Sequence, residues 1–311
     1  MQRTVSSSRS RIFYMTHHEE DTGGRRVDTV DALWRHLVHT LDPVYPDEAH
    51  RMAQWLLEEA TGLSRIQRIA HPERSIEAAE RERLDAMVQR LVAGEPLQYV
   101  VGYAHFRSLR LSVTPDVLIP RPETEQLVEQ ALEHIPVQQA VRVLDVGTGS
   151  GCIALALKHE RPDAVVVGCD VSTAALQVAQ SNAAAHGLPV PFVQADMRAS
   201  DLPDRTDGPF DLVLSNPPYV TMGEAATLPK RVRAYEPAEA LFAEQGPLQY
   251  YHALAQQRDR LLRPGGQLLV EINEAYGAAV AACFREHGLS HVELHQDLTG
   301  RDRFVGARRS R

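Results

Sequence analysis

The first third of the chain carries apolar residues at the three- and four-residue spacing of amphipathic helices. Three segments show this spacing, at residues 30–41, 47–63 and 75–96. The apolar stripe of the first segment consists of Val30, Leu33, Trp34, Leu37, Val38 and Leu41. The pattern predicts a small helical domain over residues 29–95. Because this domain holds no constellation of catalytic residue types, we expect it to serve in substrate recognition or support.

The pattern changes at Leu97, where short extended runs replace the helical spacing. Residues 97–106 and 109–119 are rich in branched and aromatic side chains, with Gly102 within the first run. They predict a β-hairpin linker over residues 96–120. A helical segment follows at residues 123–135.

From Val141 onward, short apolar runs alternate with helical segments. Strands are expected at residues 141–146, 164–170, 189–196, 210–215 and 266–272. Helices are expected at residues 152–160 and 172–187, and the last two runs, 292–298 and 303–309, are expected to pair as an edge hairpin. Alternation of this kind predicts an α/β domain over residues 121–311, with a parallel sheet covered by helices on both faces.

Composition narrows the class of protein. A chain of 311 residues with 43% hydrophobic and 24% charged residues is typical of a globular protein. No apolar run approaches the roughly 20 residues that a membrane-spanning helix needs. The formal net charge is −8, with 15 basic and 17 acidic residues through Pro120 and 18 and 24 after it. Since neither part is basic, we expect no stable binding to nucleic acid and no membrane association.

Cysteine usage points to a reducing compartment. Cys152, Cys169 and Cys283 are odd in number and lack metal-ligand spacing. The 14 histidines do not pair with them at the spacings of zinc sites, so we expect no metal. Residues 1–28 are rich in Arg and Ser, which is typical of a disordered tail or an overlong start and, as the alternative, of an organellar targeting segment. The expected location is the cytoplasm.

The first strand of the α/β domain ends in "LDVGTGSG", which predicts a sharp turn that brings the backbone close to a ligand. The spacing is neither that of a dinucleotide fingerprint nor that of a P-loop. Asp170 ends the second strand, nineteen residues after the last glycine, where an acid suits the hydroxyls of a ribose. Asp196 and Met197 follow the third strand and suit an adenine amine and ring face. Asp145 is expected either to orient the loop or to lie near a cationic group.

Together these positions indicate an adenosine cofactor without a pyrophosphate, namely S-adenosyl-L-methionine. An ordinary tight turn with solvated acids is the alternative. The candidate cofactor-binding residues are Gly147, Thr148, Gly149, Ser150, Gly151, Asp170, Asp196, Met197 and Asn216.

The segment "SNPPYV" follows the fourth strand, so Asn216 is expected at the same rim of the sheet as the glycine loop. A planar amide or exocyclic nitrogen is a poor nucleophile because its lone pair is delocalised. The Asn216 side-chain oxygen and the Pro217 backbone carbonyl could hold its two N–H groups, while Pro218 fixes the turn and Tyr219 packs on the planar group. The candidate catalytic residues are therefore Asn216, Pro217 and Tyr219, and substrate binding adds Pro218. A rigid structural loop is the alternative.

Beyond these motifs, "IPRPETE", "GEPLQYVVGYAHF" and "RAYEPAEALF" resemble the peptide chain release factor glutamine N5-methyltransferases, the HemK/PrmC family. The resemblance extends from residue 30 to residue 309. It implies a Rossmann-like, seven-stranded class I methyltransferase domain, preceded by a small helical domain and a β-hairpin linker. It also implies methyl transfer from S-adenosylmethionine to the side-chain nitrogen of the glutamine in the Gly-Gly-Gln motif of class I release factors.

By this resemblance, residues 147–151 and Asp170 bind the cofactor and residues 216–219 hold the glutamine. Met197 departs from the pattern, because many relatives carry an aromatic residue there. The protein is expected to act as a monomer on release factors.

Three alternatives remain at this point. A related enzyme could methylate a glutamine of a large-subunit ribosomal protein, although "IPRPETE" argues against it. A nucleic-acid methyltransferase that acts on an exocyclic amine would also have to hold and orient a planar nitrogen. A non-enzymatic binding module would need only the cofactor site. For three residues, a role in the active site and a role in the scaffold are equally favoured: Arg121, Glu123 and Glu236. Phe106 is expected in the core, with a cover for the cofactor as its alternative.

Overall fold

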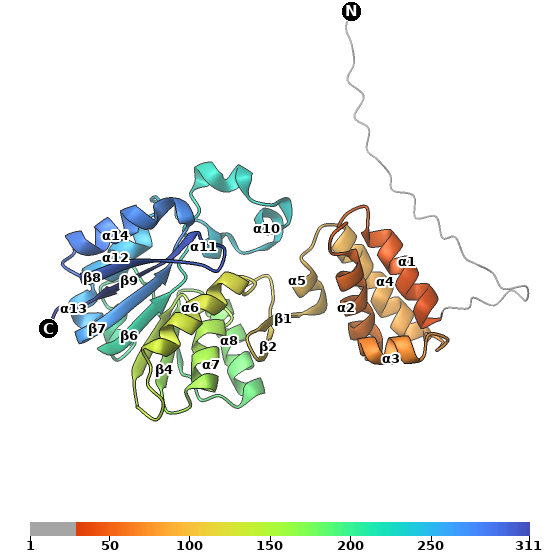
Figure 1. The fold of residues 1–311 in the computed structure, drawn as a ribbon, viewed down its shortest axis with the longest axis horizontal. Helices are drawn as coiled ribbons and strands as arrows, with labels where there is room; N and C mark the ends of the chain where they lie inside the picture. The colour runs from red at the N-terminus through yellow and green to blue at the C-terminus, as the bar shows by residue number, and fades with distance from the viewer. Residues whose placement is uncertain (1–28) are drawn as a thin grey trace, which may run out of the picture. The chain divides into compact units, whose positions relative to one another are not determined.

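The computed structural model of the protein describes residues 29–311 and divides the chain into two compact units, with the division after Val92 (Figure 1). The expectations for residues 1–28 lie outside the described residues. Within residues 29–311, no helix is long and apolar enough to cross a membrane.

The first unit is helical, as the spacing predicts. Its helices are α1 (Val30–Leu41), α2 (Ala49–Thr61), α3 (Arg65–Ala70) and α4 (Ala78–Val92). Leucines from the predicted stripes are buried in its core, among them Leu33, Leu37, Leu56, Leu84 and Leu91. The three predicted helices are confirmed. The short helix α3 is an addition to the prediction, and it buries none of its residues.

The second unit opens with a correction to the predicted hairpin. Residues 97–101, expected to be extended, form a helical turn, α5 (Leu97–Val101), which ends at Gly102 in the left-handed conformation. The hairpin itself is shorter, with β1 (Tyr103–Phe106) antiparallel to β2 (Leu109–Ser112). It belongs to the second unit, because Phe106 is 1% exposed and packs in that unit's core. The prediction that Phe106 is a core residue is confirmed.

A seven-stranded sheet forms the centre of the second unit, in the order β5-β4-β3-β6-β7-β9-β8. Its strands are β3 (Arg142–Val146), β4 (Val165–Asp170), β5 (Phe192–Gln194), β6 (Phe210–Ser215), β7 (Leu262–Glu271), β8 (Ser290–Gln296) and β9 (Asp302–Arg308). The first five are parallel, and β9 runs antiparallel to both β7 and β8. This arrangement confirms the predicted seven-stranded α/β class and the closing hairpin.

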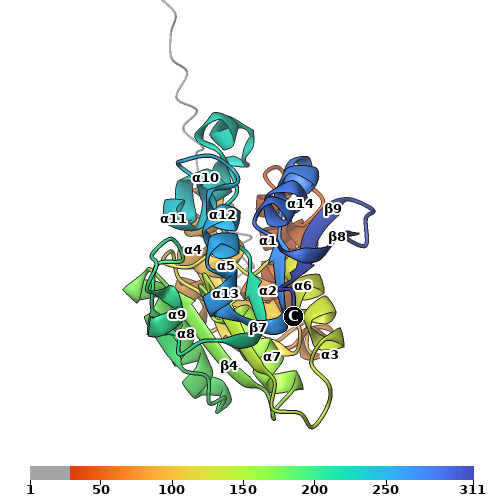
Figure 2. The same ribbon diagram turned by 90° about the vertical axis from the view of Figure 1, so that its left-hand side faces the viewer.

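Helices cover both faces of the sheet (Figures 1 and 2). The helices of the second unit that follow the hairpin are α6 (Pro122–Glu133), α7 (Cys152–Glu160), α8 (Thr173–His186), α9 (Leu202–Arg205), α10 (Lys230–Tyr235), α11 (Ala238–Leu241), α12 (Gln249–Gln256), α13 (Arg258–Leu261) and α14 (Gly277–Glu286). Short 3₁₀ turns occupy Met222–Thr227 and Glu274–Tyr276. Leu127 of α6 and Leu155 of α7 pack in one apolar core, and Leu254 of α12 and Phe284 of α14 pack in the other.

Candidate active site

A cavity of about 370 Å³ opens at the carboxyl ends of the parallel strands. Loops after β3, β4, β5 and β6 supply its walls, together with the segment before α6, the start of α11 and Tyr250 of α12. A volume of this size suits a small organic ligand, and this rim is where open α/β sheets bind their ligands.

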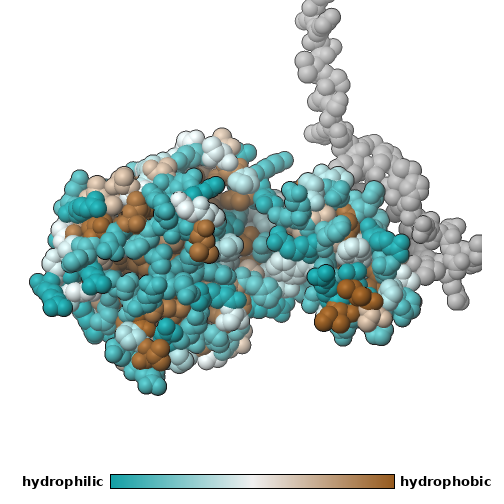
Figure 3. All heavy atoms as spheres, in the orientation of Figure 1, coloured by the Kyte–Doolittle hydropathy of each residue, from teal (hydrophilic) through white to brown (hydrophobic). Residues whose placement is uncertain are grey.

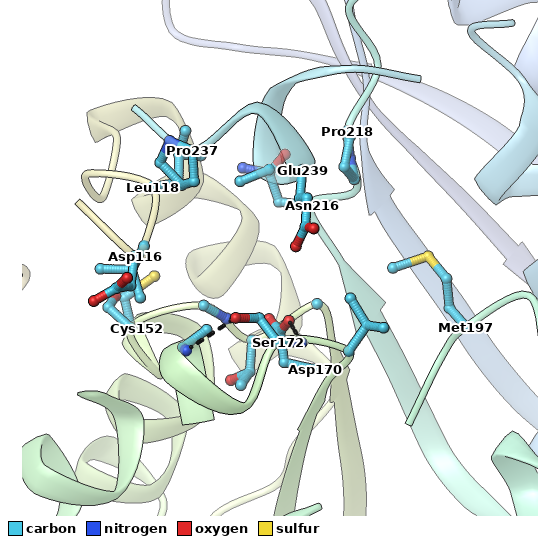
Figure 4. A pocket seen from close by; sticks show the side chains of 18 of the residues that line it. Asp116, Leu118, Cys152, Asp170, Ser172, Met197, Asn216, Pro218, Pro237 and Glu239 are labelled. Carbon is cyan, nitrogen blue, oxygen red and sulfur yellow. Dashed lines mark hydrogen bonds between the residues drawn. The ribbon is translucent and has the colours of Figure 1, made fainter. Parts of the chain in front are cut away.

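Most of the predicted site residues meet in this cavity (Figure 4). Its walls include Gly147, Thr148, Gly149, Ser150, Asp170, Asp196, Met197, Asn216 and Pro218. Gly151, Pro217 and Tyr219 are not among the lining residues. The sequence motifs therefore converge on one pocket, but three of the predicted residues stand behind its surface.

The glycine loop adopts the backbone conformation that its composition predicts. Gly147, Gly149 and Gly151 all have positive φ, at 74°, 54° and 82°. A Cβ on Gly147 would stand 3.3 Å from the Met197 methyl group, and one on Gly151 would approach Leu155 within 3.1 Å. The absence of a side chain at Gly147 thus leaves room for Met197 in the cavity wall. The absence of one at Gly151 permits the loop to pack closely against Leu155.

Asp170 ties the glycine loop to the end of β4. One carboxylate oxygen accepts a hydrogen bond from the Gly149 N–H at 2.9 Å, and the other accepts from the Ser172 N–H at 3.0 Å. Burial raises the pKa of Asp170. Each oxygen keeps acceptor capacity beyond these bonds, so the carboxylate can receive hydroxyl groups of a ligand in the cavity.

Asp145 orients the loop from within the core. It is fully buried, and one oxygen accepts from the Thr148 hydroxyl at 2.6 Å and from the Ala154 N–H at 3.2 Å. Burial raises its pKa to about 7. Asp145 does not line the cavity, so its contacts favour the loop-orienting role over a cationic partner.

The wall after β5 combines a charged and an apolar residue. Asp196 pairs with Arg198 at 2.9 Å, which lowers the pKa of Asp196. The Met197 side chain points into the same cavity (Figure 4). Tyr250 of α12 also lines it, an aromatic residue that sequence reasoning missed. Tyr250 carried no recognisable signal, because its place in the wall depends on how α12 packs against the sheet.

Asn216 is held by two buried residues from distant parts of the chain. Its side-chain N–H donates to the Thr124 hydroxyl oxygen at 3.0 Å, and that hydroxyl donates to Glu271 at 2.7 Å. Thr124 is 3% exposed and Glu271 is 1% exposed. Burial raises the pKa of Glu271 to about 7. Sequence reasoning missed both residues, although Thr124 lies within the "PETE" motif.

Two of the three motif residues after Asn216 do not line the cavity, namely Pro217 and Tyr219. Pro217 is buried and Tyr219 is half-buried, with burial raising the pKa of its phenol. The next residue, Val220, bonds through its N–H to the Leu241 carbonyl at 3.1 Å. The segment beyond the motif is thereby tied to the end of α11.

Arg121 and Glu236 join two walls of the cavity. The Arg121 guanidinium bonds both carboxylate oxygens of Glu236, at 2.5 and 2.6 Å, and Glu236 also accepts from the Ile119 N–H at 3.3 Å. Arg121 lines the cavity, whereas Glu236 is 6% exposed and lies behind it. Glu123 is not a lining residue. The contacts of Glu236 favour a scaffold role, and Arg121 serves both as wall and as anchor.

Comparison with known proteins agrees with this geometry. A family model described as the methyltransferase small domain matches residues 126–250, and one described as the PrmC N-terminal domain matches residues 32–102. The crystal structure of a methyltransferase from Pyrococcus furiosus covers 76% of this chain and 100% of its own, at a TM-score of 0.50 and 15% identity. That likeness supports the fold.

Curated relatives are much closer in sequence. The release factor glutamine methyltransferase of Chlorobaculum tepidum is 41% identical over 83% of this chain and 89% of its own length. The enzyme of the same name from Nitratidesulfovibrio vulgaris is 39% identical over 91% of this chain and 96% of its own. On this similarity, the chain belongs to the release factor glutamine methyltransferase family.

Proposed function

We propose that the protein transfers a methyl group from S-adenosylmethionine to the side-chain amide nitrogen, N5, of the glutamine in the Gly-Gly-Gln motif of class I release factors. The observation that carries the proposal is the position of Asn216, whose oriented amide lies in the same cavity as the glycine loop and Asp170. The identity of the acceptor is inferred from membership of the family, and the oriented Asn216 amide offers a way to hold it.

The cavity fits S-adenosylmethionine. Asp170 offers acceptor oxygens for the ribose hydroxyls, and Met197 with Tyr250 offers apolar and aromatic surface for the adenine. The glycine loop lets the backbone approach the ligand closely. When bound, S-adenosylmethionine supplies an electrophilic methyl group on a sulfonium centre.

The hydrogen bonds around Thr124 determine which atom of Asn216 is available to a substrate. A threonine hydroxyl has one proton, and this proton goes to Glu271. The Thr124 oxygen therefore accepts from the Asn216 amino group, and the Asn216 carbonyl oxygen is left free as an acceptor. An acceptor is what an amide N–H of the substrate requires.

This arrangement addresses the weak nucleophilicity of an amide nitrogen. In the proposal, the Asn216 oxygen accepts one N–H group of the glutamine and stabilises the positive charge that develops as the new bond forms. The motif assigns the second N–H group to the Pro217 carbonyl, although Pro217 is not a lining residue of the cavity. The rigid Pro217-Pro218 backbone fixes their direction, and Tyr219 supports the loop from behind. Positioning then accounts for most of the rate, and the excess proton leaves after the transfer.

The alternative acceptors are less favoured. Eight curated relatives, 35 to 41% identical to this chain over most of its length, share the release factor name. A net charge of −8 does not favour grip on a nucleic-acid backbone. A purely binding module would have no use for an oriented Asn216.

The finer assignments stay proposals. We propose that the helical unit of residues 29–92 recognises the release factor, that the enzyme acts as a monomer, and that it works in the cytoplasm, where release factors meet their ribosomes. The Rossmann-like domain, with the segment that leads into α6, holds the cofactor and carries out catalysis.

An acceptor panel tests the function. The protein is incubated with S-adenosylmethionine and, separately, with a class I release factor, the same factor with its Gly-Gly-Gln glutamine changed to alanine, ribosomal proteins and RNA. The intact mass of each acceptor is then measured. We expect one added methyl group on the native factor alone. Methylation of the alanine variant, or of ribosomal protein or RNA in preference to the factor, would overturn the proposal.

A further inference from the structure

Three metal-ligating side chains converge away from the active site, between α12 and α14. His252 lies on α12, Cys283 lies on α14, and His287 is the residue at the carboxyl-terminal cap of α14. One ligand atom of each lies within 4.8 Å of those of the other two. Cys283 is 2% exposed, and both histidines are half-buried, so the group is reachable from solvent.

Helix geometry explains the convergence. Cys283 and His287 are four residues apart and therefore share one face of the helical turn. Helix α12 packs against α14 and brings His252 to that face (Figure 1). The expectation of no metal rested on sequence spacing, which does not record this group, because His252 lies 31 residues from Cys283 in sequence.

The distances suit a tetrahedral ion. The Cys283 sulfur lies 3.2 Å from Nδ1 of His252. Bond lengths of about 2.3 Å to sulfur and 2.1 Å to nitrogen place tetrahedral ligand atoms about 3.5 Å apart. The separation from His252 is close to that value, and one ligand atom of each of the three residues lies within 4.8 Å of the others, so side-chain rotations can complete the site.

We propose that His252, Cys283 and His287 bind one zinc-class divalent cation, which cross-links α12 to α14. Two imidazoles and a thiolate are the donor set that borderline-soft cations prefer. As the metal–sulfur bond forms, the thiol proton leaves to solvent, and a water molecule completes the four ligands. The site is separate from the methyl-transfer cavity, since none of its three residues lines that cavity.

The surroundings support a cation. His287 Nδ1 lies 2.8 Å from the Cys283 carbonyl oxygen, to which its N–H donates, so Nε2 is the nitrogen with a free lone pair. The Glu286 carboxylate adds negative charge near Cys283. The neighbouring cation Arg258 is engaged by the Ala255 carbonyl and by Asp259, each at 3.3 Å.

Metal titration of the untagged, full-length protein tests the site. The protein is stripped with a chelator and titrated with Zn²⁺ against a chromophoric competitor, and in parallel with Co²⁺. We expect one equivalent of Zn²⁺ to bind and to raise the melting temperature. The Co²⁺ form should show the visible bands of a tetrahedral ion and a thiolate-to-cobalt charge-transfer band.

Substitutions identify the ligands. His252→Asn and His287→Asn should each weaken Zn²⁺ binding at least ~10-fold, and Cys283→Ala should abolish the charge-transfer band. His291→Asn, at an exposed position outside the group, is the matched control and should bind as the parent does. The melting temperature of each metal-free variant verifies folding. Failure of the folded parent to bind one equivalent, or binding that survives the three substitutions, would overturn the proposal.

Discussion

Thr124 lines the cavity, and its hydroxyl decides which end of the Asn216 amide is offered to the substrate. Thr124→Val keeps the shape of the side chain and removes both hydrogen bonds. We expect kcat to fall about 10- to 100-fold, which corresponds to one or two lost hydrogen bonds. The dissociation constant of S-adenosylmethionine should stay within about threefold, because the substitution keeps the shape of the side chain and the proposed cofactor contacts come from Asp170, Met197 and Tyr250.

Thr124→Ser is the matched control for this prediction, since it restores the hydroxyl, and it should recover most of the activity. Single-turnover methylation and calorimetric cofactor binding provide the two readouts. Equal activity of the valine and serine variants would remove Thr124 from its positioning role.

Glu271 should make the hydrogen bonds from Asn216 to Thr124 and from Thr124 to Glu271 depend on pH. Burial raises the pKa of Glu271 to about 7; the hydrogen bond from Thr124 and the charges of Arg303 and Arg121 lower it, and Glu123 raises it. A protonated Glu271 can donate to Thr124, which then donates to Asn216 and turns the wrong end of the amide toward the substrate. Activity should therefore rise as pH increases through about 7, with roughly tenfold loss per unit well below it.

Single-turnover rates between pH 5.5 and 8.5, values chosen to lie about 1.5 units on each side of that pKa, measure the dependence. Glu271→Gln should be slow and should lose this inflection, whereas an unchanged profile in that variant would exclude Glu271. A raised pKa also means that the folded state holds a proton that the unfolded state releases. Glu271 thus contributes stability below about pH 4.5 that is lost as pH rises through about 7.

At the residue scale, the sequence predicts site residues that lie within one motif. It does not predict contacts between residues that are far apart in the chain. The glycines, Asp170 and Asn216 each follow a recognisable strand, so the rim where they meet could be foreseen. Thr124 and Glu271 are 147 residues apart, and only the packing of α6 against β7 brings them together. Tyr250 reaches the cavity for the same reason.

Helix α3 exposes apolar side chains that are not buried in the core of the helical unit. Ile66 is 80% exposed and Ile69 is 60% exposed, and Figure 3 shows a hydrophobic patch where α3 lies in Figure 1. If the helical unit recognises the release factor, these residues are candidates for the contact. Changing both to Glu should raise KM for the release factor about tenfold or more and leave kcat unchanged.

Leu298→Glu is the matched control, because Leu298 is 91% exposed but belongs to the second unit. Steady-state kinetics with the intact release factor distinguish the variants. An unchanged KM in the doubly substituted protein, or an equal rise in the Leu298 variant, would place the recognition surface elsewhere.

Two elements show where hydrophobic periodicity fails as a guide. Helix α3 has no buried residue, so only its capping box of Ser64 and Gln67 marks it in the sequence. Residues 97–101 are apolar and short, a combination that periodicity cannot assign to helix or strand. Their flanking Pro96 and Gly102 fit a helical turn and were the better signal.

At the scale of the whole molecule, every residue that lines the cavity belongs to the second of the two units. Cofactor at about 100 times its dissociation constant should stabilise the protein by about 2.7 kcal/mol. Hydrogen exchange should slow around residues 147–151, 170–172 and 216–218 and stay unchanged in α1 to α4. Asp170→Ala should reduce both effects, and equal protection of the helical unit would contradict the assignment of the cavity.

At this scale the sequence was most informative. Strand-helix alternation is repeated along the second unit, and the chirality and pairing rules of parallel sheets leave few arrangements for such a chain. The alternation predicts the parallel sheet with helices on both faces, and the family resemblance implies its seven strands; the order of the strands comes from the structure. The three-dimensional grouping of His252, Cys283 and His287 does not follow from the sequence, because no pattern of apolar residues records which polar side chains meet across two helices.

The most direct test of the account is a paired measurement on Asn216→Ala. Single-turnover methylation of the release factor and calorimetric binding of S-adenosylmethionine are measured on the same preparation. If the Asn216 oxygen holds the acceptor amide, turnover should fall at least ~100-fold while the cofactor dissociation constant changes less than about threefold. Near-normal turnover, or a loss of cofactor binding as large as the loss of turnover, would contradict the account.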